Sequence, residues 1–132
     1  MKITADTNIL VRAITGDHEP QSRRAQAVLA AAELVALPMP VLCELVWVLA
    51  RGYKISSPDI AATIHRLMDA DNIALNRPAT EAGLVVLEAG GDFADGAIAY
   101  EGQGLGGQEF VSFDQDTVRI LAARGVAAQL LT

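Results

Sequence analysis

Apolar and polar positions follow two different periods along this chain. Residues 2–5 alternate between polar and apolar side chains, which is the period of a half-buried strand. Directly afterwards Ile9, Leu10 and Ala13 recur at the spacing of one helix face. The chain therefore opens with a short strand, which is followed at once by a helix from Thr7 to about Ile14.

The same two patterns alternate through the rest of the chain. Short apolar runs closed by turn residues predict strands over residues 34–37, 72–75, 110–113 and 126–130. Apolar residues at every third or fourth position predict a helix beginning near Pro20 and further helices over residues 40–51, 58–68, 78–88, 96–100 and 117–124. The glycine-rich run 101–107 predicts that the helix starting at Gly96 ends early.

Strands that alternate with helices predict a three-layer α/β/α fold with a central, mainly parallel sheet of four to five strands. At 132 residues we expect a single domain over residues 1–132, with enough chain to bury a core. No apolar run approaches the roughly 18 residues of a membrane span. Cys43 is the only cysteine, so an internal disulfide is excluded, and the absence of a signal-peptide pattern fits a cytoplasmic protein.

The balance of charge limits the kind of nucleic-acid protein this chain can be. It has 16 acidic against 10 basic residues, for a formal net charge of −6. This argues against a general nucleic-acid coat protein, whose affinity comes from Lys and Arg on phosphates. It does not argue against a nucleic-acid enzyme, because a divalent cation held by several acids offsets their charge locally.

Four acids stand at positions that solubility does not explain. Asp6 and Asp114 directly follow predicted strands, Glu44 interrupts an apolar helix, and Asp95 follows Phe93 and Ala94 at a helix start. Strand ends and helix N-termini meet at the carboxyl edge of a parallel sheet, so we expect these four side chains to converge.

Converging carboxylates need a counter-charge. Two of them about 4 Å apart repel by roughly 1 kcal/mol in water and about 4 kcal/mol at an effective dielectric constant near 20. A hard cation removes this conflict, and an acid cluster without His or Cys favours Mg²⁺ or Mn²⁺ over Zn²⁺. The matching chemistry is metal-assisted attack of water on a phosphodiester.

Each acid also has a structural interpretation. Asp6 and Asp114 are suitable helix caps, and Glu44 is close enough in sequence to pair with Arg51 or Lys54. Phosphotransfer domains also end strands in Asp, but two features speak against them. The dehalogenase type needs a second Asp where this chain has Asn8, and the receiver type needs a late Lys, whereas no Lys follows Lys54.

In these residues the chain resembles the PIN-domain ribonucleases and, among them, the VapC-type toxins of VapBC toxin–antitoxin pairs. The resemblance covers essentially the whole chain in order and spacing. It rests on residues 6–10, Glu44, residues 93–95 with 98–99, and residues 110–116.

The resemblance implies a Mg²⁺- or Mn²⁺-dependent endoribonuclease that forms a homodimer and is inhibited by a small VapB-like antitoxin. It implies that Asp6 and Asp95 are the principal metal ligands and that Asp114 completes the site directly or through water. Glu44 would hold a metal-bound water or a second ion and help to position the nucleophile.

Other residues follow from the same resemblance. Thr7, Asn8 and Ser112 would orient the acids through hydrogen bonds, and Asp116 either shares the role of Asp114 or is a solvated helix-end acid. Asp92 is an additional acid near Asp95 or a helix cap. Weak candidates for contacts with RNA phosphates are Arg12, Arg51 and Lys54.

Three further expectations concern packing and partners. Gly96 stands where the family usually has Ala, which predicts a looser helix beside Asp95. Trp47 is expected in the core or in a dimer contact rather than as a base-stacking platform. The helices have more apolar side chains than one small core can bury, and the resemblance implies that the excess forms the antitoxin groove. These side chains include Val41, Leu45, Val48 and Leu49.

Two alternative functions stay open at this point. One is a PIN scaffold that binds RNA or a partner with little or no nuclease activity, although the presence of all four acids speaks against it. The other is a housekeeping RNA-processing nuclease.

Overall fold

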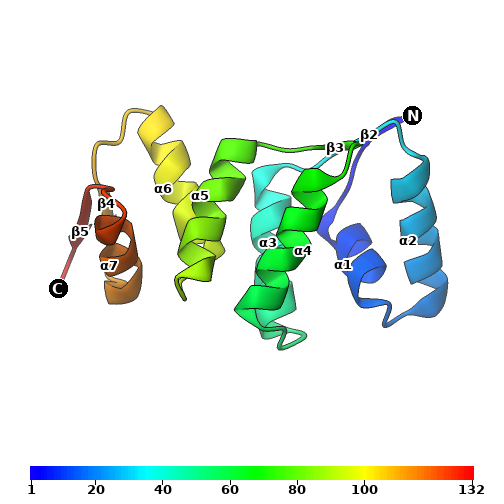
Figure 1. Cartoon of the computed structure of the whole chain (residues 1–132), viewed down its shortest axis with the longest axis horizontal. Coiled ribbons are helices and arrows are strands. Elements are labelled where there is room, and N and C mark those ends of the chain that lie inside the picture. Colours follow the sequence, from blue (N-terminus) through cyan, green and yellow to red (C-terminus); the bar gives the residue numbers. More distant parts are fainter. The chain divides into compact units, whose positions relative to one another are not determined.

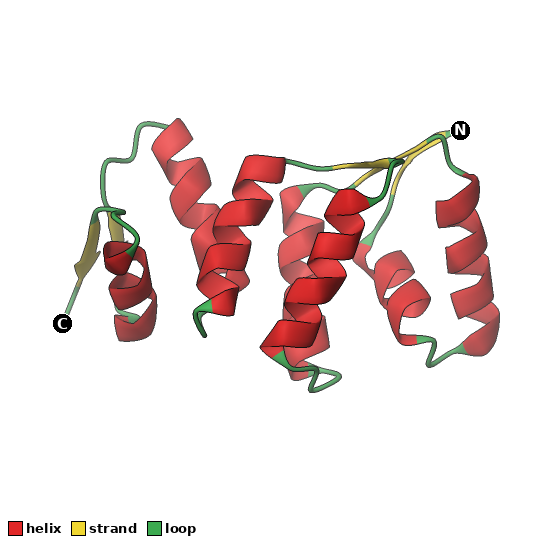
Figure 2. Cartoon of the chain, viewed as in Figure 1, coloured by secondary structure: helices red, strands yellow, loops and turns green.

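Helices and strands alternate along the chain as the sequence predicted (Figure 2). The computed structural model describes residues 1–132 and contains two compact units, Met1–Asn76 and Arg77–Thr132. The first unit consists of β1 (Lys2–Thr4), α1 (Thr7–Thr15), α2 (Glu19–Ala31), β2 (Leu34–Ala36), α3 (Met39–Arg51), α4 (Ser57–Asp69) and β3 (Ile73–Ala74) (Figure 1). The second consists of α5 (Arg77–Glu88), α6 (Phe93–Gly104), β4 (Phe110–Ser112), α7 (Gln115–Ala123) and β5 (Ala128–Leu130).

The first unit is built on a three-stranded parallel sheet in the order β1-β2-β3. Ile3 lies opposite Val35, and Val35 lies opposite Ile73 in the third strand. Val35 has no exposed surface, as expected for the middle strand of a parallel sheet that is covered on both faces.

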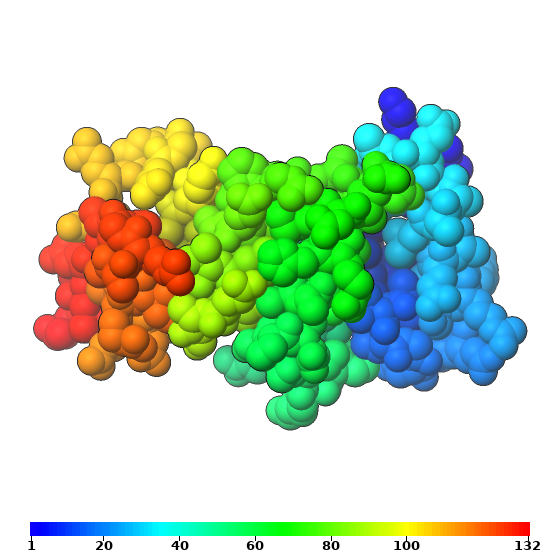
Figure 3. Space-filling model, viewed as in Figure 1, coloured from blue at the N-terminus to red at the C-terminus, as the bar shows by residue number.

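The core of the first unit lies where α3 packs against α1 and α4. Leu42, Leu45 and Leu49 of α3 and Ile60 and Ile64 of α4 are fully buried. The space-filling view shows α4, in green, and α2, in light blue, at the outer surface of this unit (Figure 3). Leu45 and Leu49 are therefore core residues, and the prediction that they belong to a surplus apolar surface is wrong.

The second unit pairs β4 and β5 in parallel, with Phe110 opposite Ala128. Val86 of α5, Ala99 of α6 and Ile120 of α7 form a buried cluster against which Phe110 packs. All five predicted strands form, and every observed pairing is parallel. The predicted α/β class is thus confirmed, and seven helices with parallel strands are consistent with the three-layer α/β/α fold.

Helix α6 differs from its prediction, because it continues through Glu101 to Gly104 instead of ending near Tyr100. Its N-terminus is capped by Asp92, whose Oδ1 accepts a hydrogen bond from the Ala94 amide at 2.9 Å. Extensive packing against α5 stabilises the helix despite its glycines.

Gly96 explains how closely α5 and α6 approach. A Cβ added at Gly96 would lie 2.4 Å from the carbonyl oxygen of Ala82, which is far inside van der Waals contact. Gly83 likewise leaves room for the ring of Phe93, which would lie 2.6 Å from a Cβ there. The prediction that Gly96 loosens the helix is therefore wrong, since it marks a tight contact between helices.

Candidate metal centre

Asp6 and Glu44 face one pocket of the first unit. Asp6 follows β1 directly and begins α1, and Glu44 lies on α3, which packs against α1. Both side chains are exposed. The pocket has a volume of about 430 Å³ and is lined by Asp6, Thr7, Asn8, Val11, Arg12, Glu44, Val48 and Tyr53. The structure thus brings together two of the four predicted acids.

Neither acid is fully engaged by the rest of the chain. Oδ1 of Asp6 accepts a hydrogen bond from the Thr7 amide at 2.7 Å, so Asp6 does cap α1 as its structural interpretation proposed. A carboxylate has about four acceptor positions, and most of those on Asp6 stay available. Glu44 forms no ion pair with Arg51 or Lys54, so its structural interpretation is not observed.

The hydroxyl of Thr7 is the one buried side-chain polar atom without a hydrogen-bond partner. Thr7 is 5% exposed and lines the pocket beside Asp6 and Glu44. A buried hydroxyl without a partner costs about 1–3 kcal/mol, and such groups are typical of places that water or an ion completes. The pocket offers oxygen donors and no His or Cys, which fits Mg²⁺ or Mn²⁺ and does not fit a structural Zn²⁺ site.

Asp95 and Asp114 belong to the second unit, where one threonine connects them. The Thr117 hydroxyl donates a hydrogen bond to Oδ2 of Asp95 at 2.9 Å. The Thr117 amide donates to Oδ1 of Asp114 at 3.1 Å, so Asp114 caps α7. Thr117 is 1% exposed and holds both carboxylates. Sequence reasoning missed it, although its place three residues after a capping Asp was a usable signal.

The electrostatics of the second unit favour a cation near Asp95. Burial raises the pKa of Asp95 above its ordinary value, although the hydrogen bond from Thr117 lowers it in part. The nearby carboxylates of Asp92 and Asp114 raise the pKa of Asp95 further, because like charges disfavour ionisation. A bound divalent cation would reverse this effect and keep Asp95 ionised.

The other predicted residues of the second unit have clear local contacts. Ser112 Oγ accepts a hydrogen bond from the Asp114 amide at 2.9 Å, so it contacts the backbone that carries the acid. Asp116 is exposed, and its Oδ1 accepts a hydrogen bond from Arg119 at 3.3 Å, as in a solvated first-turn acid. Asp92 is the cap of α6.

The basic candidates of the first unit differ in their surroundings. Arg12 lines the pocket of Asp6 and forms an ion pair with Asp17 at 2.9 Å. Arg51 lies over the ring of Trp47, 5.9 Å from its centroid. Trp47 is 58% exposed, which excludes the core, and the dimer contact stays a prediction. Lys54 is exposed in a loop with a φ of 56°.

Asp17 was not predicted from the sequence and holds Arg12 in place. Its carboxylate accepts hydrogen bonds from the Tyr53 hydroxyl at 2.6 Å and from Thr15 Oγ1 at 2.9 Å. These hydrogen bonds and the guanidinium of Arg12 lower the pKa of Asp17 from 3.8 to about 2. Asp17 therefore stays ionised and anchors one nitrogen of Arg12 beside the pocket.

Each unit thus contains one pair of the predicted acids, and no group of three or more His, Cys, Asp or Glu side chains that could hold a metal ion is present. No helix of the chain is both long and apolar enough to span a membrane.

The sequence matches the PIN domain family over residues 3–122, a range that contains all four acids. No curated protein matches the sequence significantly. PIN domains are typically metal-dependent nucleases, and the chain belongs to this family.

Proposed function

We propose that this protein is a Mg²⁺- or Mn²⁺-dependent endoribonuclease and the toxin of a VapBC-type toxin–antitoxin module. The observation that carries the nuclease proposal is the pocket in which Asp6 and Glu44 lie beside the unpartnered hydroxyl of Thr7. Membership of the PIN family and the family-like order of the four acids support it further.

In this proposal Asp6, Asp95 and Asp114 would be the metal ligands, and Glu44 would position the attacking water. When bound, the ion supplies water activation and stabilises charge on the leaving oxygen. Asp6 already has its carboxylate oriented by the Thr7 amide, which leaves its other oxygen for the ion. Thr7 and Asn8 line the same pocket, and the side-chain amide of Asn8 is suited to hydrogen-bond a water or a phosphate oxygen.

The acids of the second unit are oriented in advance in the same manner. Thr117 holds Asp95 and Asp114 through its hydroxyl and its amide, and Ser112 contacts the amide of Asp114. Groups that orient metal ligands in this way commonly change metal affinity or activity by about 10- to 100-fold when they are removed. Thr117 is therefore a positioning residue in the proposed reaction.

The proposed partners are RNA, a second copy of the chain and a small antitoxin. The resemblance to VapC-type toxins supports all three. An exposed Trp47 adjoining Arg51 also supports a protein interface, because Trp and Arg are enriched at interface centres. We place this interface on α3 and leave the choice between the second copy and the antitoxin to experiment.

The central experiment compares Asp6→Asn with Asp116→Asn in protein stripped of metal with a chelator. Mn²⁺ should restore cleavage of a mixed RNA substrate in the wild type and in Asp116→Asn, because Asp116 is exposed and paired with Arg119. Asp6→Asn should lose more activity than the roughly 10- to 100-fold that is typical of residues which only orient ligands. Retained cleavage in Asp6→Asn would remove Asp6 from the mechanism.

Metal binding has a second readout that does not depend on activity. Mn²⁺ at 100 times its Kd should stabilise the wild type by about 2.7 kcal/mol and raise its Tm, and the shift should shrink in Asp6→Asn. No shift in the wild type would contradict the metal site.

The toxin role is tested separately in cells. Expression of the wild type in a bacterial host should slow growth, and co-expression of its cognate antitoxin should relieve the inhibition. Harmless expression of an active enzyme would favour the housekeeping nuclease, and harmless expression of an inactive protein would favour the binding scaffold.

A further inference from the structure

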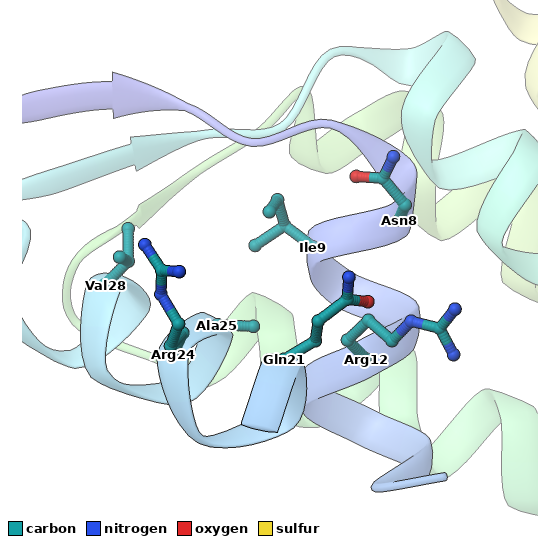
Figure 4. Close-up of a pocket in the computed structure, with 7 residues that line it drawn as sticks. All are labelled: Asn8, Ile9, Arg12, Gln21, Arg24, Ala25 and Val28. Atoms are coloured by element: carbon teal, nitrogen blue, oxygen red, sulfur yellow. The ribbon is translucent and has the colours of Figure 1, made fainter. Parts of the chain in front are cut away.

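A groove of about 520 Å³ lies between α1 and α2 in the first unit (Figure 4). Ile9 of α1 and Gln21 of α2 point into the space between the two helices (Figure 4). The groove is lined by Asn8, Ile9, Arg12, Gln21, Arg24, Ala25 and Val28.

The floor of the groove is apolar and held by a fixed contact between the helices. Gln26 of α2 donates a hydrogen bond to the Ala13 carbonyl oxygen of α1 at 3.0 Å, which ties the two helices together. Ile9 is half-buried and Ala25 is buried, while Val28 stays 51% exposed. The groove therefore offers a small apolar surface to a ligand without any rearrangement.

The edge of the groove is polar, and much of it is unpartnered. No hydrogen bond or ion pair within the chain engages the side chains of Asn8, Gln21 or Arg24. The neighbouring Arg23 differs, because it pairs with Glu19 one turn away. In a chain with a net charge of −6, an unpaired guanidinium beside an apolar floor favours an anionic ligand that also has an apolar face.

The groove adjoins the pocket of the acids along α1. Asn8 and Arg12 line both the groove and the pocket that contains Asp6 and Glu44. The guanidinium of Arg12 turns away from Ile9 to the other side of α1 (Figure 4), where it meets Asp17. A polymer that extends from the groove across Asn8 and Arg12 would enter the pocket that contains Asp6.

We propose that the α1–α2 groove is a nucleotide subsite for single-stranded RNA on one side of the scissile phosphate. The base lies on Ile9 and Val28, Arg24 binds the phosphate of the same strand, and Arg12 binds the next phosphate toward Asp6. Single-stranded RNA fits because its unstacked bases can reach an apolar surface, whereas duplex bases cannot. The identity of the ligand rests on the proposed ribonuclease function.

RNA accounts for the lining better than an acidic peptide does. Four of the seven lining side chains are polar, and two of these are amides that can both donate to and accept from a base edge. The exposed surface of the groove is mainly apolar, because the aliphatic stems of the longer polar side chains add to Ile9, Ala25 and Val28, and an unstacked base can lie on such a surface. The adjoining pocket of Asp6 and Glu44 also favours a ligand that is long enough to reach the acids.

The first test compares Arg24→Ala with Arg23→Ala in the full chain. Both variants remove one exposed arginine from α2, but only Arg24 lines the groove. Binding of a fluorescent single-stranded oligoribonucleotide is measured in chelator, so that cleavage plays no part. Arg24→Ala should weaken RNA binding about tenfold, as expected for the loss of one charge-assisted hydrogen bond. The slope of log affinity against log salt concentration should also fall by about one, because one phosphate contact is lost. Arg23→Ala should match the wild type.

The second test places a carboxylate on the floor. Val28→Glu should abolish most RNA binding by repelling phosphates, whereas Ala27→Glu adds the same charge at an exposed position of α2 outside the groove and should have little effect. Far-UV circular dichroism checks that both variants fold. The proposal is overturned if Arg24→Ala binds RNA as tightly as Arg23→Ala and Val28→Glu binds it as tightly as Ala27→Glu.

The outcomes separate the subsite from the nuclease function. A protein that binds RNA through Arg24 but never cleaves it with Mn²⁺ retains the subsite and refutes the proposed enzyme. A protein that cleaves RNA while Arg24→Ala and Val28→Glu bind RNA normally refutes the subsite alone. If the same variants bind RNA normally but no longer bind a small acidic partner protein, the groove is a protein-docking surface and the proposal is wrong.

Discussion

Replacing Gly96 with alanine tests the packing that supports Asp95. Gly96 follows Asp95 on α6 and is buried against α5. Its missing side chain lets the two helices approach closely, so the smallest possible addition should force them apart.

The expected cost follows from the distances at this position. An added Cβ would lie 2.4 Å from the Ala82 carbonyl oxygen and 2.9 Å from both Gly83 Cα and a methyl of Val86. The two nearest atoms are backbone, so no side-chain rotation relieves them and α6 must move by about 1 Å. Overpacking of this kind costs about 1–3 kcal/mol, and a backbone contact belongs at the upper end. Alanine returns up to about 1 kcal/mol of helix propensity, so we expect a net loss of about 2 kcal/mol.

Gly102 provides a matched control in the same helix. A Cβ at Gly102 would meet nothing within 4 Å. Gly102→Ala should therefore be neutral or stabilise the protein by up to about 1 kcal/mol. Urea unfolding followed by far-UV circular dichroism gives both free energies of unfolding, and unchanged m-values would show that the same transition is compared.

The result that refutes this reasoning is a Gly96→Ala variant as stable as the wild type or more so. That outcome would mean that α5 and α6 have room to separate at little cost, and that Gly96 is only a weak point of α6. If the variant loses stability as expected, it should also bind Mn²⁺ less tightly, because the shift of α6 disturbs the 2.9 Å hydrogen bond between Thr117 and Asp95.

Two further predictions concern pH. Burial raises the pKa of Asp95, so its ionised form is disfavoured in the folded state; Asp95→Asn should therefore stabilise the metal-free protein at pH 7. Urea unfolding should show that this gain shrinks as the pH falls through the raised pKa, where the wild type is protonated, and a constant gain would contradict the cause given. Tyr53→Phe removes the main hydrogen bond that lowers the pKa of Asp17 to about 2, so NMR titration should find that pKa closer to 3.8. The stability that the wild type has above pH 4 and loses toward pH 2 should be smaller in Tyr53→Phe, and an unchanged pKa of Asp17 would contradict the assignment.

The sequence predicted the elements well because their signals are local. The alternation of residues 2–5 and the helical spacing after Thr7 both depend on neighbours within about four positions, and β1 and α1 formed there. The capping role of Asp6 and Asp114 was also visible, since a cap bonds to an amide one to three residues away. The PIN family was recognisable from the same short segments.

Packing between elements was predicted less well. The glycines at 101–107 indicated an early end to α6, but the helix continues to Gly104, and its first half packs closely against α5 at Gly96. Trp47 was expected in the core or in a dimer contact and is exposed in the single chain, while Leu45 and Leu49 were expected in a surface groove and are buried. Hydrophobicity ranks residues for burial, but only the neighbouring helices decide which of them is covered.

By itself, the sequence determined the class of the fold, the order of its elements, and the placing of four acids at the ends of strands or on helices. Tertiary structure decided what surrounds those acids. Thr117 reaches Asp95 across 22 residues of chain, and Gly96 meets Ala82 of the preceding helix. Tyr53 lowers the pKa of Asp17 from 36 residues away. Contacts at such separations leave no periodic trace in the sequence, because they depend on how helices pack and not on the spacing of residues within one of them.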